Sequence, residues 1–286
     1  MTDFIPSLFN PAQAVSMTSA GLIVPNSGNP YNGLIRAGDG IPADQAGRVA
    51  GTSSPSVLAI PAGAPRGLYG IANRWMPRFS FAWAPFSNKK TSVRGGFGSF
   101  HDRPEGNLIF SQTKLPPFTP QVQYQNGDLS NPSGGTAPAA APQGAISAID
   151  PNLRLPTVYT YNFGIQHEFP RGYLLDVTYA GNVGHHLLRQ PNINEPSFAA
   201  LTANQAIPSA QRPATNSILP YPGYTNINYY MSDSNSNYNS LQTRLTKRRG
   251  NSIFTVNYTW SHALADTPAN FNSTTDVIEW ADRHFN

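Results

Sequence analysis

The feature that most constrains the fold of this chain is a strict alternation of apolar and polar residues, which recurs in several separate segments. In residues 157–168, the side chains of Tyr159, Tyr161, Phe163 and Ile165 share one parity, and the residues between them are polar or glycine. Because successive side chains of a β-strand point to opposite faces, this pattern predicts strands with one apolar and one polar face. Helical periodicity is scarce, so we expect an all-β protein.

Six such segments form three hairpins, each closed by a short turn. Much longer stretches, residues 103–156 and 189–236, connect one hairpin to the next. In an up-and-down antiparallel sheet, alternate connections lie at opposite edges, so all the short turns share one edge and all the long loops share the other. The expected strands are 78–86 and 91–102, 157–168 and 172–184, and 237–247 and 252–262.

This asymmetry of the connections is typical of outer-membrane barrels, which have short periplasmic turns and long extracellular loops. A strand of about 12 residues is about 40 Å long, and a tilt of about 45° gives it a height of roughly 28 Å, close to the hydrocarbon thickness of a bilayer. We therefore predict an antiparallel up-and-down transmembrane β-barrel. Residues 1–74 are expected to form an extracellular loop region, and residues 75–286 a partial outer-membrane barrel.

The parity of each strand also predicts which side chains meet lipid and which meet water. A barrel in a membrane places its apolar side chains outward and its polar ones toward a wet lumen. The side chains expected to face lipid are Phe79, Phe163, Val177 and Phe254. Those expected to face the lumen are Asn162, Gln166, Asp176, Arg244 and Asn257.

Six strands are too few to close such a barrel, because bacterial barrels have at least about 8. The first basic residue is Arg36, and no basic segment followed by an apolar one marks a secretory signal. We therefore expect the barrel to be incomplete and the sequence to be a piece of a longer protein. The alternative is a soluble secreted β-sandwich, serving as an adhesin or carbohydrate-binding module, because a sandwich shows the same alternation.

Composition excludes several kinds of function. The chain has no cysteine, which removes disulfide scaffolds, cysteine-based zinc sites and thiol catalysis. Its net charge of +4 is small and scattered, so we expect no nucleic-acid partner. Ser261, His262 and Asp266 have the residue types of a hydrolytic triad but lie close together in the sequence without a nucleophile elbow. We expect no enzyme activity, no catalytic residue and no cofactor.

Two motifs suggest metal binding, and neither is convincing. His185 and His186 are adjacent, and neighbouring residues on a strand point to opposite faces, so they are not expected to share one ion. The segment starting at Asp233 begins like a calcium loop but has Tyr238 where the loop needs glycine. We therefore predict no metal site.

Ligand-binding residues are largely unknown from the sequence. The long loops hold clustered aromatic residues, and exposed aromatic rings stack on sugars or pack on peptides. On that basis Tyr224, Tyr229 and Tyr230 are candidate ligand contacts. The alternative is that these rings pack the loops against one another.

Several phrases of the sequence resemble one family in their order along the chain. They are PRFSFAWAPF with KTSVRGGFG at 77–98, YNFGIQHE with VTYAGN at 161–182, and SNYNSLQ, LTKR and YTWS between 236 and 261. Together they resemble the barrel region of TonB-dependent receptors of the Oar-like type. The resemblance spans about residues 75–286, and residues 1–74 look like an extracellular loop of that family.

The resemblance implies a barrel of about 22 strands in the outer membrane of a Gram-negative-type bacterium. It also implies an N-terminal plug and substrate uptake energised by an inner-membrane TonB-type complex that acts through the plug. No plug segment is recognisable in this sequence. The expected partners are outer-membrane lipid, that energising complex and a carbohydrate, peptide or chelate substrate. No ligand residue can be carried over from the family.

Overall fold

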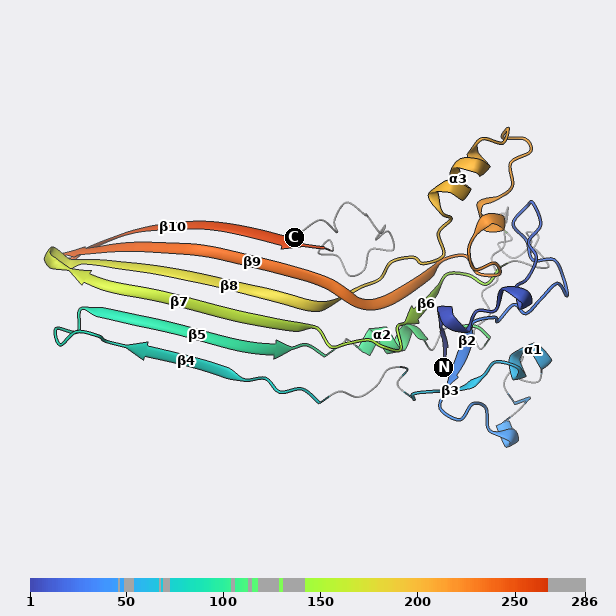
Figure 1. Cartoon of the computed structure of the whole chain (residues 1–286), viewed down its shortest axis with the longest axis horizontal. Coiled ribbons are helices and arrows are strands. Elements are labelled where there is room, and N and C mark those ends of the chain that lie inside the picture. Colours follow the sequence, from blue (N-terminus) through green and yellow to red (C-terminus); the bar gives the residue numbers. More distant parts are fainter. Residues whose placement is uncertain are drawn as a thin grey trace.

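The structure, a computed structural model, consists of a long sheet and a cluster of loops at one end of it (Figure 1). We call the long sheet the stem and the loop cluster the head. The head comprises the described residues before 69, those in 106–156 and those in 190–230. The residues that the structure describes are 1–45, 47–48, 54–66, 68, 73–103, 106–112, 115–117, 129–130 and 142–266.

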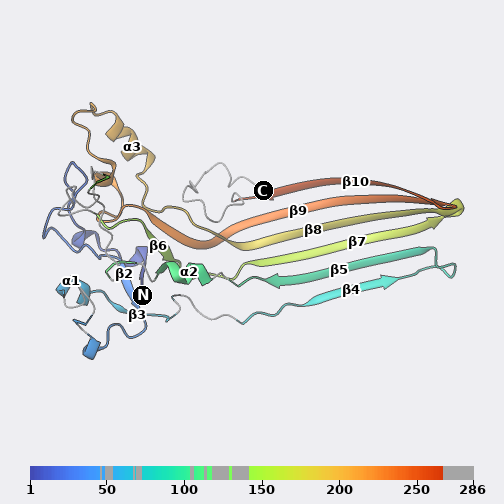
Figure 2. The same ribbon diagram turned by 180° about the vertical axis from the view of Figure 1, so that it is seen from behind.

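Six antiparallel strands form the stem, in the order β10-β9-β8-β7-β5-β4. The hairpin turns β4–β5, β7–β8 and β9–β10 lie at the end far from the head, as both views show (Figures 1 and 2). The strand bounds are β4 Arg78–Trp83, β5 Thr91–His101, β7 Thr157–Phe169, β8 Tyr173–Arg189, β9 Ile227–Arg249 and β10 Ser252–Ala265. The predicted three hairpins and their antiparallel pairing are therefore confirmed.

The turn between β7 and β8 shows how the sequence closes these hairpins. Pro170 follows the last residue of β7, and Arg171 and Gly172 both have positive φ, at 67° and 77°. This left-handed conformation is what a tight hairpin connection needs, and glycine adopts it without a steric penalty. An added Cβ at Gly172 would lie 2.6 Å from the carbonyl oxygen of Arg248, near the end of β9. The close approach of this second turn therefore also favours glycine at position 172.

The largest error in the predicted strand bounds concerns β9, which starts at Ile227 rather than at residue 237. Its first four residues, Ile227–Tyr230, are all buried, and they pair in parallel with β6, Ile146–Ile149. Both faces of β9 are covered there because the strand has entered the head. The alternation that marks a half-exposed strand is consequently lost, and the sequence pattern does not report this part of β9.

Short elements build the head. Strand β2, Leu34–Ala37, pairs antiparallel with β1, Thr2–Phe4, and parallel with β3, Ala62–Ala64. This small sheet lies in the region predicted as loop, since strands of three or four residues are too short to show a period. The helices are α1 Pro55–Leu58, α2 Gly106–Ser111 and α3 Phe198–Gln205, and none of those described is long and apolar enough to cross a membrane.

A hydrophobic core holds the head together. The largest fully buried side chains include Phe4, Leu34, Ile146, Tyr224 and Ile227. The Phe4 ring meets the Tyr224 ring edge-on, with centroids 5.3 Å apart. These residues come from three distant parts of the chain, so the head is one packed unit and not a set of independent loops.

Candidate functional site

One face of the stem is apolar and open. Phe79 and Phe254 are each 68% exposed and Tyr258 is 62% exposed. Tyr161 and Leu175, which a sandwich would cover with a second sheet, are not buried either. Within the described part of the chain no second layer covers this face, so the β-sandwich alternative is not supported.

The apolar face has the height of a membrane. Along β8, the apolar face extends from Tyr173, at the turn end, to Val183, nearer the head, and each of these residues belongs to a row of paired residues on neighbouring strands. That interval is about ten residues, or roughly 34 Å along the strand, and a tilt of about 45° reduces it to about 24 Å. Outer-membrane barrels present an apolar band of about 25 Å.

The opposite face of the stem is polar, as predicted. One cross-strand row joins Gln166, Asp176, Arg244 and Asn257 on four neighbouring strands. Arg94, on β5, donates a hydrogen bond to Gln166 across 2.9 Å. The row gives this face fixed charges of both signs and several amide groups, the kind of surface that a water-filled interior requires.

Asn162 lies two polar rows closer to the head, beyond the row of Gly164 and Thr178. It pairs with Gly96 on one side and Ala180 on the other, and Ala180 pairs with Ser240. All five predicted lumen residues therefore lie on the polar face. The four predicted lipid-facing residues, Phe79, Phe163, Val177 and Phe254, lie on the apolar face.

The candidate ligand residues of the head are buried. Tyr224 is 1% exposed, and its hydroxyl donates a hydrogen bond of 2.9 Å to the backbone oxygen of Asn32. Tyr229 and Tyr230 are also buried. Burial raises the pKa of the Tyr224 and Tyr229 hydroxyls. Of the two alternatives that the sequence left open, this burial favours the one in which the rings pack the loops together, and a ligand reaches them only if the head opens.

Asn194 organises the same loop and was not singled out in the sequence. Its side-chain nitrogen donates to the backbone oxygens of Tyr221, Tyr224 and Thr225, and its side-chain oxygen accepts from the Tyr221 amide. The side chain is buried, so these bonds replace water completely. A single asparagine in a loop carries no sequence signal that distinguishes this role.

Arg36 is a second residue that the sequence did not reveal. It lies on β2 at 7% exposure, and its Nε and Nη2 atoms have no hydrogen-bond partner among the described residues. Burial lowers the pKa of the guanidinium. A buried guanidinium with unused donors is costly unless a partner compensates it. Arg36 therefore marks the β2 region of the head as a place where an anionic group would be stabilised.

Asp3 is the buried acid of the head. Its carboxylate accepts hydrogen bonds of 2.9 Å from the amides of Phe4 and Ile149, which tie β1 to β6. Burial raises its pKa to about 7, although the two amides act in the opposite direction. The carboxyl therefore changes charge near neutral pH.

The structure also places the residues of the other motifs considered in the sequence. Asp233, the first residue of the calcium-like segment, receives two hydrogen bonds from Arg189. Ser261 lies on the polar face of β10 and His262 on the apolar face. Asp266 accepts hydrogen bonds from the amide and the side chain of Asn235.

The sequence was compared with protein families and with curated proteins. The sequence matches the family described as outer membrane beta barrel domain over residues 5–286. A comparison with curated proteins found no match.

Several solved structures are similar to part of this chain at low sequence identity. The outer membrane transporter YddB from Escherichia coli is 12% identical with a TM-score of 0.40, and the match covers 67% of this chain and 20% of that chain. The FrpB iron transporter from Neisseria meningitidis (F3-3 variant) is 9% identical with a TM-score of 0.37, covering 66% and 20%. The siderophore receptor PirA from Pseudomonas aeruginosa is 14% identical with a TM-score of 0.37, covering 66% and 28%. This chain thus spans less than a third of the length of each.

Proposed function

Because this chain belongs to the outer membrane beta barrel domain family and lies in the outer membrane of a Gram-negative bacterium, we propose that it forms part of a TonB-dependent receptor. The open antiparallel sheet is then an incomplete barrel, as the sequence predicted. In this function the head captures a substrate outside the cell, and the polar face of the stem lines the route inward.

The observation that carries the proposal is the two-faced stem with a packed head at one edge only. The apolar face matches the thickness of a bilayer, and the polar row of Gln166, Asp176 and Arg244 lies on the other side. A packed head of loops at the edge opposite the short turns supports an extracellular position for the described part of residues 1–74.

The substrate class that we propose is a carbohydrate, peptide or chelate, and we propose that a TonB-type complex supplies the energy. Arg36 favours substrates that carry an anionic group, because its buried donors lack partners in the described structure. The tyrosines Tyr224, Tyr229 and Tyr230 remain candidate contacts for a state in which the head has opened.

Uptake measurements in cells test this function. The full polypeptide is expressed in a Gram-negative host, and uptake of a labelled oligosaccharide, peptide and ferric chelate is compared with and without a protonophore. Energised transport predicts that uptake of at least one substrate stops when the protonophore is added. Uptake that continues unchanged would instead indicate a passive pore.

Matched substitutions connect the result to the stem. Arg244→Ala removes a charge from the polar face and is expected to lower the uptake rate several-fold. Leu245→Ala, at the next position on β9, alters the apolar face and is expected to leave uptake nearly unchanged while the protein still reaches the membrane. If both substitutions lower uptake equally, the polar face is not the route.

A further inference from the structure

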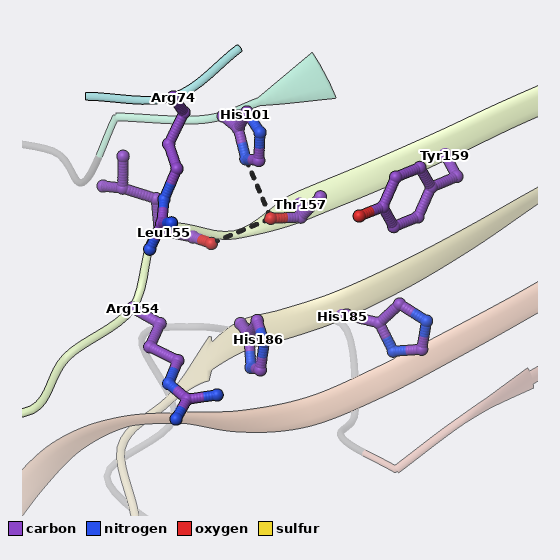
Figure 3. Close-up of a pocket in the computed structure, with 8 residues that line it drawn as sticks. All are labelled: Arg74, His101, Arg154, Leu155, Thr157, Tyr159, His185 and His186. Atoms are coloured by element: carbon purple, nitrogen blue, oxygen red, sulfur yellow. Dashed lines mark hydrogen bonds between the residues drawn. The ribbon is translucent and has the colours of Figure 1, made fainter. Parts of the chain in front are cut away.

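A pocket at the junction of stem and head is not explained by substrate uptake. Its volume is about 470 Å³ (Figure 3). It opens on the apolar side of the stem, because Thr157, Tyr159 and His185 belong to the apolar parity of their strands. The residues that line it are Arg74, His101, Arg154, Leu155, Thr157, Tyr159, His185 and His186.

The lining is rich in nitrogen donors. Two arginines and three histidines contribute side chains, and none of the eight described lining residues is acidic. Arg74 and Arg154 lie in the segments just before β4 and β7, and both are exposed. Two guanidinium groups repel cations and give the pocket a positive potential, so the pocket suits an anion.

A β-bulge places both neighbouring histidines in this pocket. The pairing of β8 with β9 shifts between Gly184 and Leu187, and His186 has φ of 57°, in the left-handed region. A bulge redirects a side chain that regular alternation would send to the other face. The expectation that His185 and His186 point to opposite faces is therefore wrong for the pocket, which both of them line (Figure 3).

Hydrogen bonds hold two of the imidazoles in place. Nδ1 of His101 lies 2.8 Å from the Thr157 hydroxyl, and Nδ1 of His185 lies 2.9 Å from the Asn235 side-chain oxygen. The His185 ring also meets the Tyr159 ring edge-on. Such contacts fix the rings before any ligand arrives, which lowers the entropic cost of binding. His186 instead adopts a backbone conformation that is strained for a residue other than glycine, and strain of this kind clusters at binding sites.

The height of the pocket fits the headgroup layer of the membrane. The row that contains His101, Thr157 and His185 comes directly after the row of Val183, where the apolar band ends toward the head. In an outer-membrane barrel, side chains beyond the end of the apolar band lie at the level of the lipid headgroups and not of the acyl chains. The phosphate groups of lipids lie in that layer.

From these observations we propose that the pocket binds a phosphate group on the outward face of the barrel. Arginine suits this ligand because its planar guanidinium donates two parallel hydrogen bonds to phosphate oxygens. The phosphate comes either from the headgroup of a membrane lipid or from the surrounding solution. This site is separate from the polar face of the stem, so it stands whether or not the chain transports a substrate.

Binding of two probes to the full polypeptide tests the proposal and distinguishes the sources. Inorganic phosphate is titrated into the protein in detergent by calorimetry. In parallel, lipid retained by the protein is measured by native mass spectrometry after reconstitution into phosphatidylcholine nanodiscs with and without phosphatidic acid. Each probe is repeated with the double variant Arg74→Gln and Arg154→Gln.

The double variant Arg48→Gln and Arg66→Gln is the matched control, because it removes the same charge from exposed arginines elsewhere in the head. We expect the pocket variant to weaken binding by at least about tenfold and the control to leave it unchanged. Loss of phosphatidic acid retention alone identifies a lipid source, and loss of inorganic phosphate binding identifies a soluble one. If neither probe binds, or if the pocket variant and the control behave alike, the proposal is wrong.

His186→Asn separates binding from folding. Asparagine tolerates the left-handed conformation better than histidine, so we expect unchanged or higher thermal stability together with several-fold weaker binding of the probe that the wild type retains. A variant that binds as the wild type does would contradict a role for His186 in the site.

Discussion

The head and the stem use the same kinds of residue in opposite ways. Tyr224 in the head is 1% exposed and meets Phe4, whereas Tyr258 in the stem is 62% exposed and has no protein layer over it among the described residues. The head hides its aromatic rings from water inside a core, as soluble proteins do. The stem displays them along one face, which is favourable only where the solvent is lipid.

For the stem, the exposed fraction of an apolar side chain therefore does not report how much that side chain stabilises the protein, because lipid and not protein covers it. For the head, stability depends on a small core that joins distant segments. For the stem, it depends on strand pairing and on the bilayer. Substitutions of similar chemistry should therefore have different effects in the two regions.

The largest expected effect is that of Phe4→Ala in the head. Removing a fully buried ring leaves a cavity, and such changes cost about 3–5 kcal/mol of unfolding free energy. Hydrogen exchange of the Ile149 and Tyr229 amides, measured on the full polypeptide in detergent, reports the opening of the head. Phe254→Ala is the control, because it removes a ring of the same size from the open face. If both substitutions accelerate exchange in the head equally, the stability of the head does not depend on its own core as described.

The charge of Asp3 gives the next effect, and it acts on the head alone. The folded pKa of about 7 lies above the usual 3.8, so the folded head binds the proton more tightly than the unfolded chain does. The unfolding free energy of the head is therefore highest below about pH 4 and falls as the pH rises to about 7. The total fall is at most about 4 kcal/mol, and the unfolding free energy stays low at higher pH.

Asp3→Asn keeps the side-chain oxygen that accepts from Phe4 and Ile149, and it removes the charge. We expect the variant to be more stable than the wild type at pH 8 and to show a flatter dependence between pH 4 and 7. Hydrogen exchange of the β6 amides, corrected for its intrinsic pH dependence, provides the measurement. An unchanged pH profile in the variant would show that another group titrates.

In the stem, Val177→Arg is expected to cost about 2–4 kcal/mol, because it places a charge in the middle of the apolar face. Thr259→Arg, on the polar face of β10 next to Tyr258, is the matched control and should cost less. Folding into phospholipid vesicles, followed by urea titration, measures both. If the two arginines are tolerated equally, the apolar face does not meet lipid.

The smallest effect is that of Tyr224→Phe. This change leaves the ring in the core and removes the hydrogen bond to the Asn32 backbone oxygen, which costs about 1–3 kcal/mol when the acceptor stays buried. Tyr258→Phe, in the stem, should change stability by less. Comparing the two by thermal unfolding sharpens the contrast between a buried and an exposed hydroxyl.

The sequence predicts the stem well because one face of each strand is apolar and the other is polar. This difference appears in the sequence as an alternation of residue types. Parity alone assigns Gln166, Asp176 and Arg244 to one face and Phe163 and Val177 to the other, whereas the row that joins the three polar residues comes from the strand register in the structure. The outer-membrane setting follows from the short turns, long loops and strand length, and the family resemblance added the receptor type.

The head could not be predicted in the same way. Its short strands, such as β1, have no room for a period, and residues at the start of β9 are covered on both faces. The sequence leaves open whether Tyr224, Tyr229 and Tyr230 are exposed or pack the loops, because their burial depends on contacts between distant segments, such as that of Tyr224 with Asn32, 192 residues away. The sequence did not reveal the pocket because the bulge at His186 interrupts the alternation of faces along β8, and no sequence pattern indicates this bulge.

Strand β9 runs without interruption from the core of the head to the turn at the far end of the stem (Figure 1). Its 23 residues have a contour of about 76 Å, more than twice the thickness of the hydrocarbon layer. Its first four residues pair with β6 in the head, and its residues from Ser236 onward pair with β8 and β10 in the stem. One strand therefore contributes both to the core of the head and to the two faces of the stem, so the two regions share a continuous stretch of backbone.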